Sequence, residues 1–350
     1  MAKLSNKTIW VLTSFVIFLV IVAVIAVFKY QTKQPVNKAF YYWQQTYNPS
    51  LSENSLMDTL AVNKLYIKYF DVVWDANLLR AQPVATVHFN KPCNKDYVPV
   101  VYITNEVFKN LSKKSVDSLY INITKLILAI NVNYNPTEIQ FDCDWTDKTT
   151  EKYFKFLHLF KSDKRFSNVN LSATIRLHQI KYKSRTGVPP VDRGMLMFYN
   201  MGKLKQIETT NSIFNNYDAG KYVSYLDNYP LPLDYALPVF GWSIYFRNGK
   251  SQGILNDTYA TTLDTMAYIK KLSTNRYMVV KDQFYRGIYL KTNDLIRAEF
   301  VDDALAQKAA KMLVQYSSNK PQTVALFHLN ENLITTYEIS DFKKLFDTYR

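Results

Sequence analysis

The sequence predicts an α/β protein, a (β/α)8 TIM barrel that follows an N-terminal transmembrane helix. Two observations predict this fold class. Eight stretches rich in β-branched and aromatic residues alternate with amphipathic helical patterns between residues 39 and 330. A run of 21 uncharged residues, 8–28, precedes them. Eight strands that are each followed by a helix are typical of a closed parallel barrel.

The uncharged run at residues 8–28 predicts a transmembrane anchor behind a short tail, 1–7. A helix of this length spans about 30 Å, the thickness of a bilayer core. The run is longer than the apolar core of a signal peptide and has no small-x-small cleavage site, although an unusually long signal peptide stays the alternative. Residues 29–37 are the predicted linker, and 38–350 the barrel domain.

Lysines flank the predicted anchor on both sides, so charge bias does not fix its orientation. Long C-terminal domains are translocated largely regardless of charge, and we therefore expect the barrel outside the cytoplasm, in the periplasm or extracellular space. The oligomeric state is not indicated by the sequence.

The composition excludes several classes of protein. The 27 Tyr, 21 Phe and 5 Trp exclude a disordered chain, and 8 Gly with 2 Cys exclude collagen-like and disulfide-rich folds. The glycine-rich phosphate-binding motifs and the common zinc spacings are absent from the sequence, which predicts no cofactor and no metal. The net charge is +14, but its lysines and arginines are scattered, so we expect no nucleic-acid partner.

The expected strands share β-branched and aromatic residues bounded by turn residues. They are 39–47, 64–75, 97–104, 138–145, 171–180, 194–201, 236–246 and 323–330. The expected helices are 52–62, 118–130, 150–162, 211–226, 303–316 and 341–349. Residues 249–301 do not fit one strand–helix unit and predict an insertion late in the barrel.

Side-chain alternation in strand 138–145 separates Phe141 and Cys143 from Gln140, Asp142 and Asp144. Outer helices cannot cover two carboxylates comfortably, so the acidic face is expected to point into the barrel. Cys143 then lies on the outer face as a small buried residue. A disulfide with Cys93 stays open as an alternative.

Alternation in strand 171–180 likewise turns Arg176 and His178 inward. Buried charges must be paired, so Asp142 and Arg176 fit a structural network as well as a site. Asp144 and His178 lie nearer the carboxyl ends of their strands, where the active sites of such barrels form.

Two motifs resemble those of the chitinase-like glycoside hydrolases of family 18. One is FDCDWT at 141–146, which is similar to that family's Asp-x-Asp-x-Glu on the fourth strand. The other is MFYN at 197–200, which resembles its Met-x-Tyr-Asp/Asn on the sixth. The layout also resembles a bacterial family of uncharacterised predicted barrels. The resemblance implies a TIM barrel that acts on glycans.

The resemblance fails at one position, because Thr146 stands where that family has its catalytic glutamic acid. A threonine cannot protonate the leaving glycosidic oxygen. The resemblance leaves Asp144 and Asp142 as the candidate acids, since neighbouring like charges raise one pKa. It places Tyr199 and Asn200 beside the sugar, Tyr199 as a catalytic support.

Aromatic residues near the expected strand ends are candidate platforms for sugar rings, since a flat aromatic face fits the apolar face of a sugar. These are Trp43, Trp145 and Trp242, and each is equally compatible with a place in the core. Gln44 adjoins the first of them and is assigned to the substrate with it.

The expected function is therefore that of a membrane-anchored, extracytoplasmic barrel that binds an envelope or extracellular glycan. Whether it also hydrolyses the glycan stays open because of Thr146. The alternative is a non-catalytic barrel that serves as a saccharide- or protein-binding scaffold of the envelope.

Overall fold

The computed structural model describes residues 20, 36–256 and 258–349. The predicted tail, anchor and linker at 1–37 lie outside the described residues except for positions 20, 36 and 37. Among the described residues, no helix combines the length and the apolar character needed to cross a bilayer.

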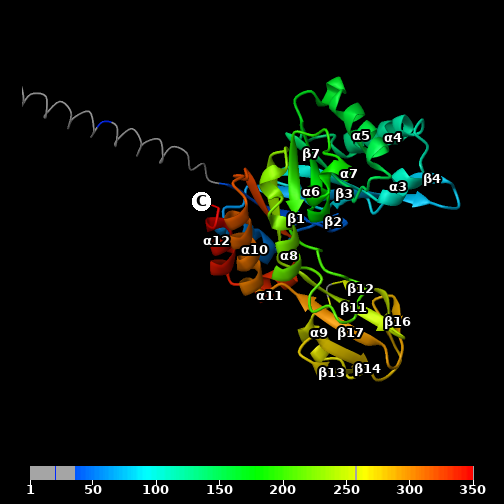
Figure 1. The fold of residues 1–350 in the computed structure, drawn as a ribbon, viewed down its shortest axis with the longest axis vertical. Helices are drawn as coiled ribbons and strands as arrows, with labels where there is room; N and C mark the ends of the chain where they lie inside the picture. The colour runs from blue at the N-terminus through cyan, green and yellow to red at the C-terminus, as the bar shows by residue number, and fades with distance from the viewer. Residues whose placement is uncertain (1–19, 21–35, 257, 350) are drawn as a thin grey trace, which may run out of the picture. The chain divides into compact units, whose positions relative to one another are not determined.

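Eight parallel strands form the closed barrel that the sequence predicted (Figure 1). They follow one another as β1-β18-β10-β9-β8-β7-β6-β3, and pairing of β3 with β1 closes the ring. The strands are β1 (Asn37–Tyr42), β3 (Lys64–Asp75), β6 (Asp96–Ile103), β7 (Glu138–Asp142), β8 (Asn170–Arg176), β9 (Arg193–Met197), β10 (Leu233–Pro238) and β18 (Thr323–Phe327).

Helices connect these strands, and three short strands lie beside the barrel. The helices are α2 (Leu51–Thr59), α3 (Asn105–Asn110), α4 (Val116–Ile130), α5 (Thr150–Lys161), α6 (Leu177–Lys181), α7 (Lys183–Thr186), α8 (Asn216–Val223), α10 (Asp303–Tyr316), α11 (Glu331–Thr336) and α12 (Ile339–Asp347). The short strands are β2 (Thr46–Tyr47), β4 (Arg80–Val84) and β5 (His88–Phe89).

The helix predicted at 211–226 is shorter than expected. Asn215 accepts a hydrogen bond from the backbone N–H of Asp218 and so starts α8 at Asn216. The residues before it belong to the loop between β9 and α8, which we call the β9–α8 loop (198–215).

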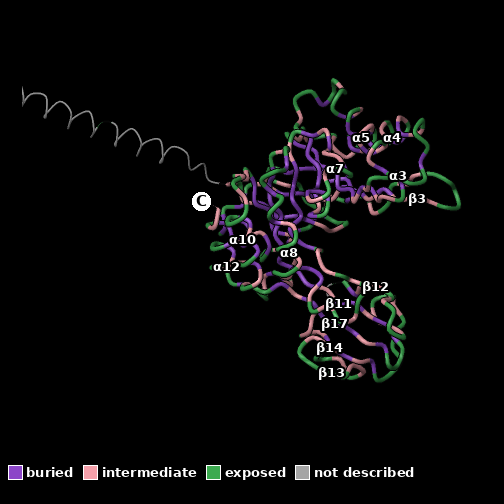
Figure 2. The backbone as a smooth tube through the Cα atoms, viewed as in Figure 1, coloured by how far each residue is buried: buried purple, intermediate pink, exposed green. Residues whose placement is uncertain are grey.

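Inward and outward faces of the strands agree with the alternation in the sequence. Phe141 faces outward, with its ring centroid 4.9 Å from that of Phe156 and 5.1 Å from that of Phe160 on α5. Tyr41 faces inward and donates a hydrogen bond to Gln140 Oε1 at 2.6 Å. Figure 2 shows the barrel strands as the buried centre of the fold.

A separate antiparallel sheet interrupts the barrel after β10 (Figure 1). Its strand order is β12-β11-β17-β14-β13, and it buries a small hydrophobic core of its own. The inserted segment consists of β11 (Gly241–Arg247), β12 (Lys250–Asn256), α9 (Ala260–Asp264), β13 (Ile269–Ser273), β14 (Arg276–Val279), β15 (Gln283–Tyr285), β16 (Ile288–Leu290) and β17 (Leu295–Phe300), of which β15 and β16 pair with each other.

The insertion therefore begins earlier than the predicted residue 249. The strand predicted at 236–246 is two strands, because the backbone leaves the barrel after Val239, whose N–H still donates to Phe327 O at 3.0 Å. From Gly241 onward the chain pairs with β17. Trp242 thus belongs to the insertion and not to a barrel strand.

Candidate functional site

The carboxyl ends of β7 and β8 bring two aspartates and an arginine together. Arg176 Nε donates to Asp144 Oδ1 at 2.5 Å, and Arg176 Nη2 lies 3.8 Å from Asp142 Oδ1. Thr174 Oγ1 donates to Asp142 Oδ1 at 2.5 Å. The guanidinium is thus held next to both carboxylates, which the sequence predicted to share the barrel interior.

Of the four predicted side chains Asp142, Asp144, Arg176 and His178, two sit elsewhere in the secondary structure than expected. β7 ends at Asp142, so Asp144 lies in the loop that follows. β8 ends at Arg176, and His178 is the second residue of α6. Both still lie at the carboxyl end of the barrel, because each is two residues past the end of its strand.

Burial and neighbouring charges shift the pKa values of Asp142, Arg176 and Tyr199. Burial raises the pKa of Asp142, Asp144 adds to the rise as a like charge, and Arg176 opposes it. Burial by itself would lower the pKa of Arg176, but Asp144 and Asp142 outweigh it and the net pKa is raised. Arg176 is therefore a permanent cation. Burial also raises the pKa of the Tyr199 phenol, which stays a neutral hydrogen-bonding group.

A cavity of about 410 Å³, which we call the mouth cavity, opens beside this group. Its size lies within the range of cavities that bind small ligands. Its polar lining is Asp71, Tyr102, Asp142, Arg176, Asn200, Asn256 and His328, and its aromatic lining is Trp43, Tyr199, Phe240, Trp242 and Phe327, with Gly241 between them.

The aromatic side of the mouth cavity is continuous. The ring centroids are 5.7 Å apart for Trp43 and Phe327, 5.3 Å for Phe327 and Phe240, and 5.4 Å for Phe240 and Trp242. This arrangement sets an apolar wall beside hydrogen-bonding groups, the combination that a sugar ring requires.

A second pocket of about 310 Å³, the side pocket, adjoins the first. It shares Arg176, Tyr199 and Asn200 with the mouth cavity and adds Asp144, Leu177, His178, Met201 and Tyr222. Partial desolvation lowers the pKa of the His178 imidazole, which favours its neutral form.

Buried polar atoms of Arg176 and Asp71 on the lining of the mouth cavity have no hydrogen-bond partner among the described residues. The Arg176 atom is the donor Nη1, and the Asp71 atom is the acceptor Oδ1. Asp71 is otherwise engaged, since Lys68 Nζ lies 3.1 Å from its Oδ2. Unpartnered buried groups are costly, so a ligand that offers one acceptor and one donor here would recover that cost.

Trp145 is placed differently from the prediction. Its side chain has no exposed surface, its Nε1 donates to Thr186 O at 2.8 Å, and its ring lies 5.3 Å from that of Tyr153. Because β7 has already ended, the residue packs beneath α5 and cannot offer a face to a sugar. Gln44 lies in the turn after β1 and lines neither the mouth cavity nor the side pocket.

Thr146 also lies away from both cavities and serves the start of α5. Its carbonyl accepts hydrogen bonds from the backbone N–H groups of Thr149 and Thr150, both at 2.9 Å. Its own N–H donates to Thr149 Oγ1 at 2.9 Å. The position of the family's catalytic acid therefore lies, in this protein, in the turn that leads into α5, three residues before the N-cap residue Thr149.

Asp71 and Tyr102 line the mouth cavity but were not among the predicted site residues. Asp71 escapes the alternation rule because the pairing of β3 with β6 shifts register between Lys68 and Phe70. Tyr102 lies one residue before the end of β6 and was detectable from strand alternation alone.

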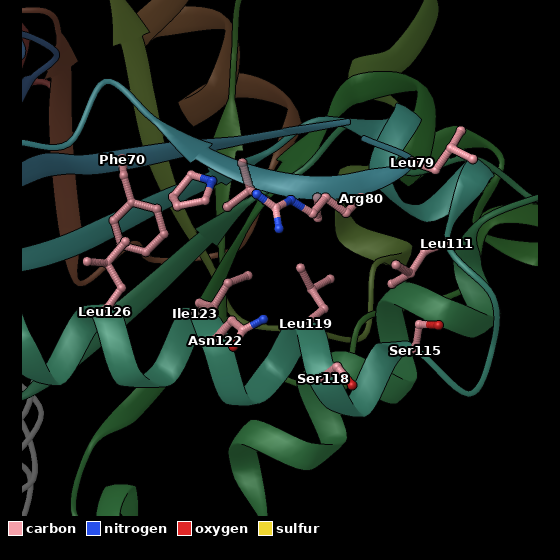
Figure 3. A pocket seen from close by; sticks show the side chains of 13 residues that line it. Phe70, Leu79, Arg80, Leu111, Ser115, Ser118, Leu119, Asn122, Ile123 and Leu126 are labelled. Carbon is pink, nitrogen blue, oxygen red and sulfur yellow. The ribbon is translucent and has the colours of Figure 1, made fainter. Parts of the chain in front are cut away.

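A further groove of about 270 Å³ lies outside the barrel, between the β3–β4 hairpin and α4 (Figure 3). Leu126 of α4 lies beside Phe70 at one end of the groove, and Ile123 and Leu119 of the same helix lie nearer to Arg80. Its lining contains no carboxylate and shares no residue with the mouth cavity. Its chemistry is that of apolar packing, and the mouth cavity is the candidate site.

Two observations concern metals and disulfides. Among the described residues, no three histidine, cysteine or acidic side chains are grouped as the ligands of a metal ion would be. Cys93 and Cys143 are both free, which contradicts the alternative that they form a disulfide.

Comparison with known proteins gives structural neighbours but no sequence family. No family model and no curated protein matches the chain. The spore cortex-lytic enzyme SleL of Bacillus cereus is 16% identical, covers 91% of this chain and 75% of its own, and has a TM-score of 0.52. SleL of Bacillus megaterium QM B1551 is 13% identical, has the same two coverages and has a TM-score of 0.52.

A chitinase from Chromobacterium violaceum ATCC 12472 is 8% identical, with 88% of this chain and 99% of its own covered and a TM-score of 0.50. The chain has the fold of the family 18 chitinases and SleL. This confirms the resemblance that FDCDWT and MFYN indicated, and at these identities the likeness concerns the fold alone.

Proposed function

We propose that this protein binds a saccharide in the mouth cavity and does not cleave it by the route of the family 18 hydrolases. One observation carries the proposal. The mouth cavity has an aromatic wall beside a polar wall, and on the polar wall Arg176 Nη1 and Asp71 Oδ1 have no hydrogen-bond partner among the described residues. A sugar ring matches both walls, because its apolar face stacks on aromatic rings while its edge donates and accepts hydrogen bonds.

The proposal of binding without cleavage rests on the two positions that would supply acid catalysis. The hydroxyl of Thr146 is too weak an acid to protonate a glycosidic oxygen, and it lies 3.4 Å from Thr149 Oγ1 at the start of α5. Asp144 Oδ1 is occupied as an acceptor by Arg176 Nε. Neither group is arranged to protonate a leaving group.

Hydrolysis is the second candidate, and the raised pKa of Asp142 favours it, since a protonated carboxyl is a potential general acid. Asp142 is only 4% exposed and is hydrogen-bonded by Thr174, which limits its reach toward a substrate. Release of reducing ends from a bound polysaccharide would decide for hydrolysis.

The proposed ligand is a polysaccharide of a cell envelope or an extracellular matrix. Support comes from the fold, which is shared with chitinases and with a spore cortex-lytic enzyme. The proposal includes anchoring through residues 8–28 with the barrel outside the cytoplasm. Membrane fractionation and protease treatment of intact cells test it, and a barrel that is protected from external protease until the cytoplasmic membrane is broken would contradict the orientation.

Binding is tested with the full chain in detergent against chitin, peptidoglycan and cellulose. We expect saturable retention on one of the first two polymers. Trp43→Ala should weaken it about tenfold or more, because truncating a buried aromatic anchor costs about 2 kcal/mol. Leu79→Ala is the matched control, since Leu79 lines the groove of Figure 3 and is 73% exposed. Equal loss in both variants, or no retention, would reject the site.

A further inference from the structure

A buried ion pair lies where the insertion meets the barrel. Arg297 Nε is 2.5 Å from Glu299 Oε1, both on β17, and neither side chain has exposed surface. The guanidinium also lies 5.3 Å from the centroid of the Phe246 ring. Desolvation of such a pair costs free energy, which hydrogen bonds from its two side chains to other groups must offset.

Glu299 Oε2 accepts three hydrogen bonds from two parts of the chain. Ser212 donates from its backbone N at 2.9 Å and from Oγ at 2.5 Å, and Trp242 Nε1 donates at 2.9 Å. One carboxylate therefore holds both the end of the β9–α8 loop and a tryptophan of the mouth cavity.

Arg297 holds the same loop at a second place. Its Nη1 donates to Gln206 O, and its Nη2 donates to Leu204 O at 3.0 Å. Arg276 adds two more contacts, with its Nη2 donating to Ile207 O at 2.9 Å and to Thr209 O at 2.8 Å. Four carbonyls of the β9–α8 loop are thus bound by arginines of the insertion.

The held loop leads back to the cavity. Asn200 N donates to Ile213 O at 2.7 Å, and Gly202 N donates to Ser212 O at 3.0 Å, so the two ends of the loop are joined. A Cβ on Gly202 would lie 2.7 Å from Ser212 Cα, which requires glycine here. Asn200 lines both the mouth cavity and the side pocket.

We propose that Glu299, paired with Arg297, is a positioning residue that sets Trp242 directly and Asn200 through Ser212 for saccharide binding. This inference rests on the proposed function. It assigns to the insertion the role of fixing two lining residues of the mouth cavity, although neither Glu299 nor Arg297 lines that cavity.

The first test is Glu299→Gln, which keeps the shape of the side chain and removes its charge. We expect saccharide binding to weaken about tenfold, the value of a hydrogen bond to a charged group. Asp294→Asn is the matched control: Asp294 is 1% exposed and pairs with Arg247 at 2.7 Å in the same insertion, without contacts to the loop or to Trp242. Equal weakening by both variants would overturn the proposal.

The second test needs no ligand and so separates this inference from the proposed function. Acrylamide quenching is compared for Glu299→Gln with and without Trp242→Phe, so that the difference reports Trp242 alone. We expect Trp242 to become more accessible in Glu299→Gln and to stay unchanged in Asp294→Asn. Unchanged Trp242 quenching in Glu299→Gln would overturn the proposal even where the wild type binds a saccharide.

A milder variant decides the case if Glu299→Gln does not fold. Ser212→Ala removes one donor to Glu299 Oε2 and leaves the ion pair intact. We expect binding to weaken about threefold, together with faster hydrogen exchange in the β9–α8 loop. Wild-type affinity and wild-type exchange in this variant would contradict a positioning role.

Discussion

The two ends of the barrel interior solve the problem of buried charge in different ways. At the amino ends of the strands, Glu138 Oε2 pairs with Lys64 Nζ at 2.9 Å and Oε1 accepts from Ser172 Oγ at 2.7 Å. At the carboxyl ends, Arg176 and Asp71 each leave one buried atom without a partner among the described residues. We call the first end the floor and the second the mouth.

The difference separates charged groups whose hydrogen-bond partners come from the protein from charged groups that keep a hydrogen-bonding atom for a ligand. Asp234 in the floor accepts from the backbone N–H groups of Gln322 and Thr323, both at 2.8 Å, and pairs with Arg193 at 3.3 Å. Its partners all come from the protein. In the mouth, charges of the same kind surround a cavity of about 410 Å³. Residue type alone does not distinguish the two ends.

The largest effect is expected in the floor. Glu138→Ala leaves the Lys64 ammonium and the Ser172 hydroxyl without their acceptor, and removal of one partner of a buried pair costs about 4 kcal/mol. We expect that loss of stability in urea denaturation, with unchanged saccharide affinity for the protein that remains folded. Weaker binding at full stability would mean that the floor belongs to the site.

Asp234 gives the floor a distinct dependence on pH. Burial raises its pKa from 3.8 to about 6, while Arg193 and the Thr323 N–H oppose the rise. A carboxyl with a raised pKa binds its proton more tightly when folded, so the contribution of Asp234 to stability is fully present below about pH 4 and is lost as the pH rises through about 6. The expected contribution is about 3 kcal/mol.

Urea denaturation of the wild type and Asp234→Asn at pH 4 and pH 6 isolates this contribution, because other groups cancel in the difference. The wild type should lose more stability between the two pH values than the variant. An equal loss in both would show that Asp234 does not titrate in this range.

In the mouth, we expect a substitution to reduce saccharide affinity more than stability. Arg176→Met removes the donor Nη1 and should weaken saccharide binding by about 2 kcal/mol, or roughly thirtyfold. Stability should change less, because the side chain of Asp144 is 47% exposed and stays solvated without its partner. The buried Asp142 keeps its hydrogen bond from Thr174, and its pKa, which burial already raises, lets it become neutral. Retention assays and urea denaturation on the same preparation compare the two. A loss of stability as large as that of Glu138→Ala would show that Arg176 stabilises the fold and is not kept for a ligand.

The barrel was predictable from the sequence because its signals are local. Each of the eight strands carries its own β-branched and aromatic residues, and alternation was enough to turn Asp142 and Arg176 inward. Alternation fails where a strand ends or shifts register. Trp145 lies past the end of β7, and Asp71 follows the irregularity at Lys68.

The contacts between the insertion and the barrel were not predictable. Glu299 meets Trp242 and Ser212 at separations of 57 and 87 residues, and nothing in the intervening sequence specifies those pairings. The early start of the insertion at Gly241 was not predictable for the same reason. The segment around Trp242 has the aromatic and β-branched residues of a barrel strand, but it pairs with β17, which lies far along the sequence.

The smallest effect is expected at the position where the resemblance to hydrolases fails. Thr146→Glu restores the acid of the Asp-x-Asp-x-Glu motif, yet the backbone there is committed to the start of α5 through Thr149 and Thr150. The new carboxylate would lie at a helix N-terminus, where a negative charge is favourable, and not in the mouth cavity. We expect unchanged stability within about 0.5 kcal/mol and no release of reducing ends from a bound polysaccharide. Hydrolysis by this variant would show that the mouth cavity extends to residue 146 and that one substitution separates binding from cleavage.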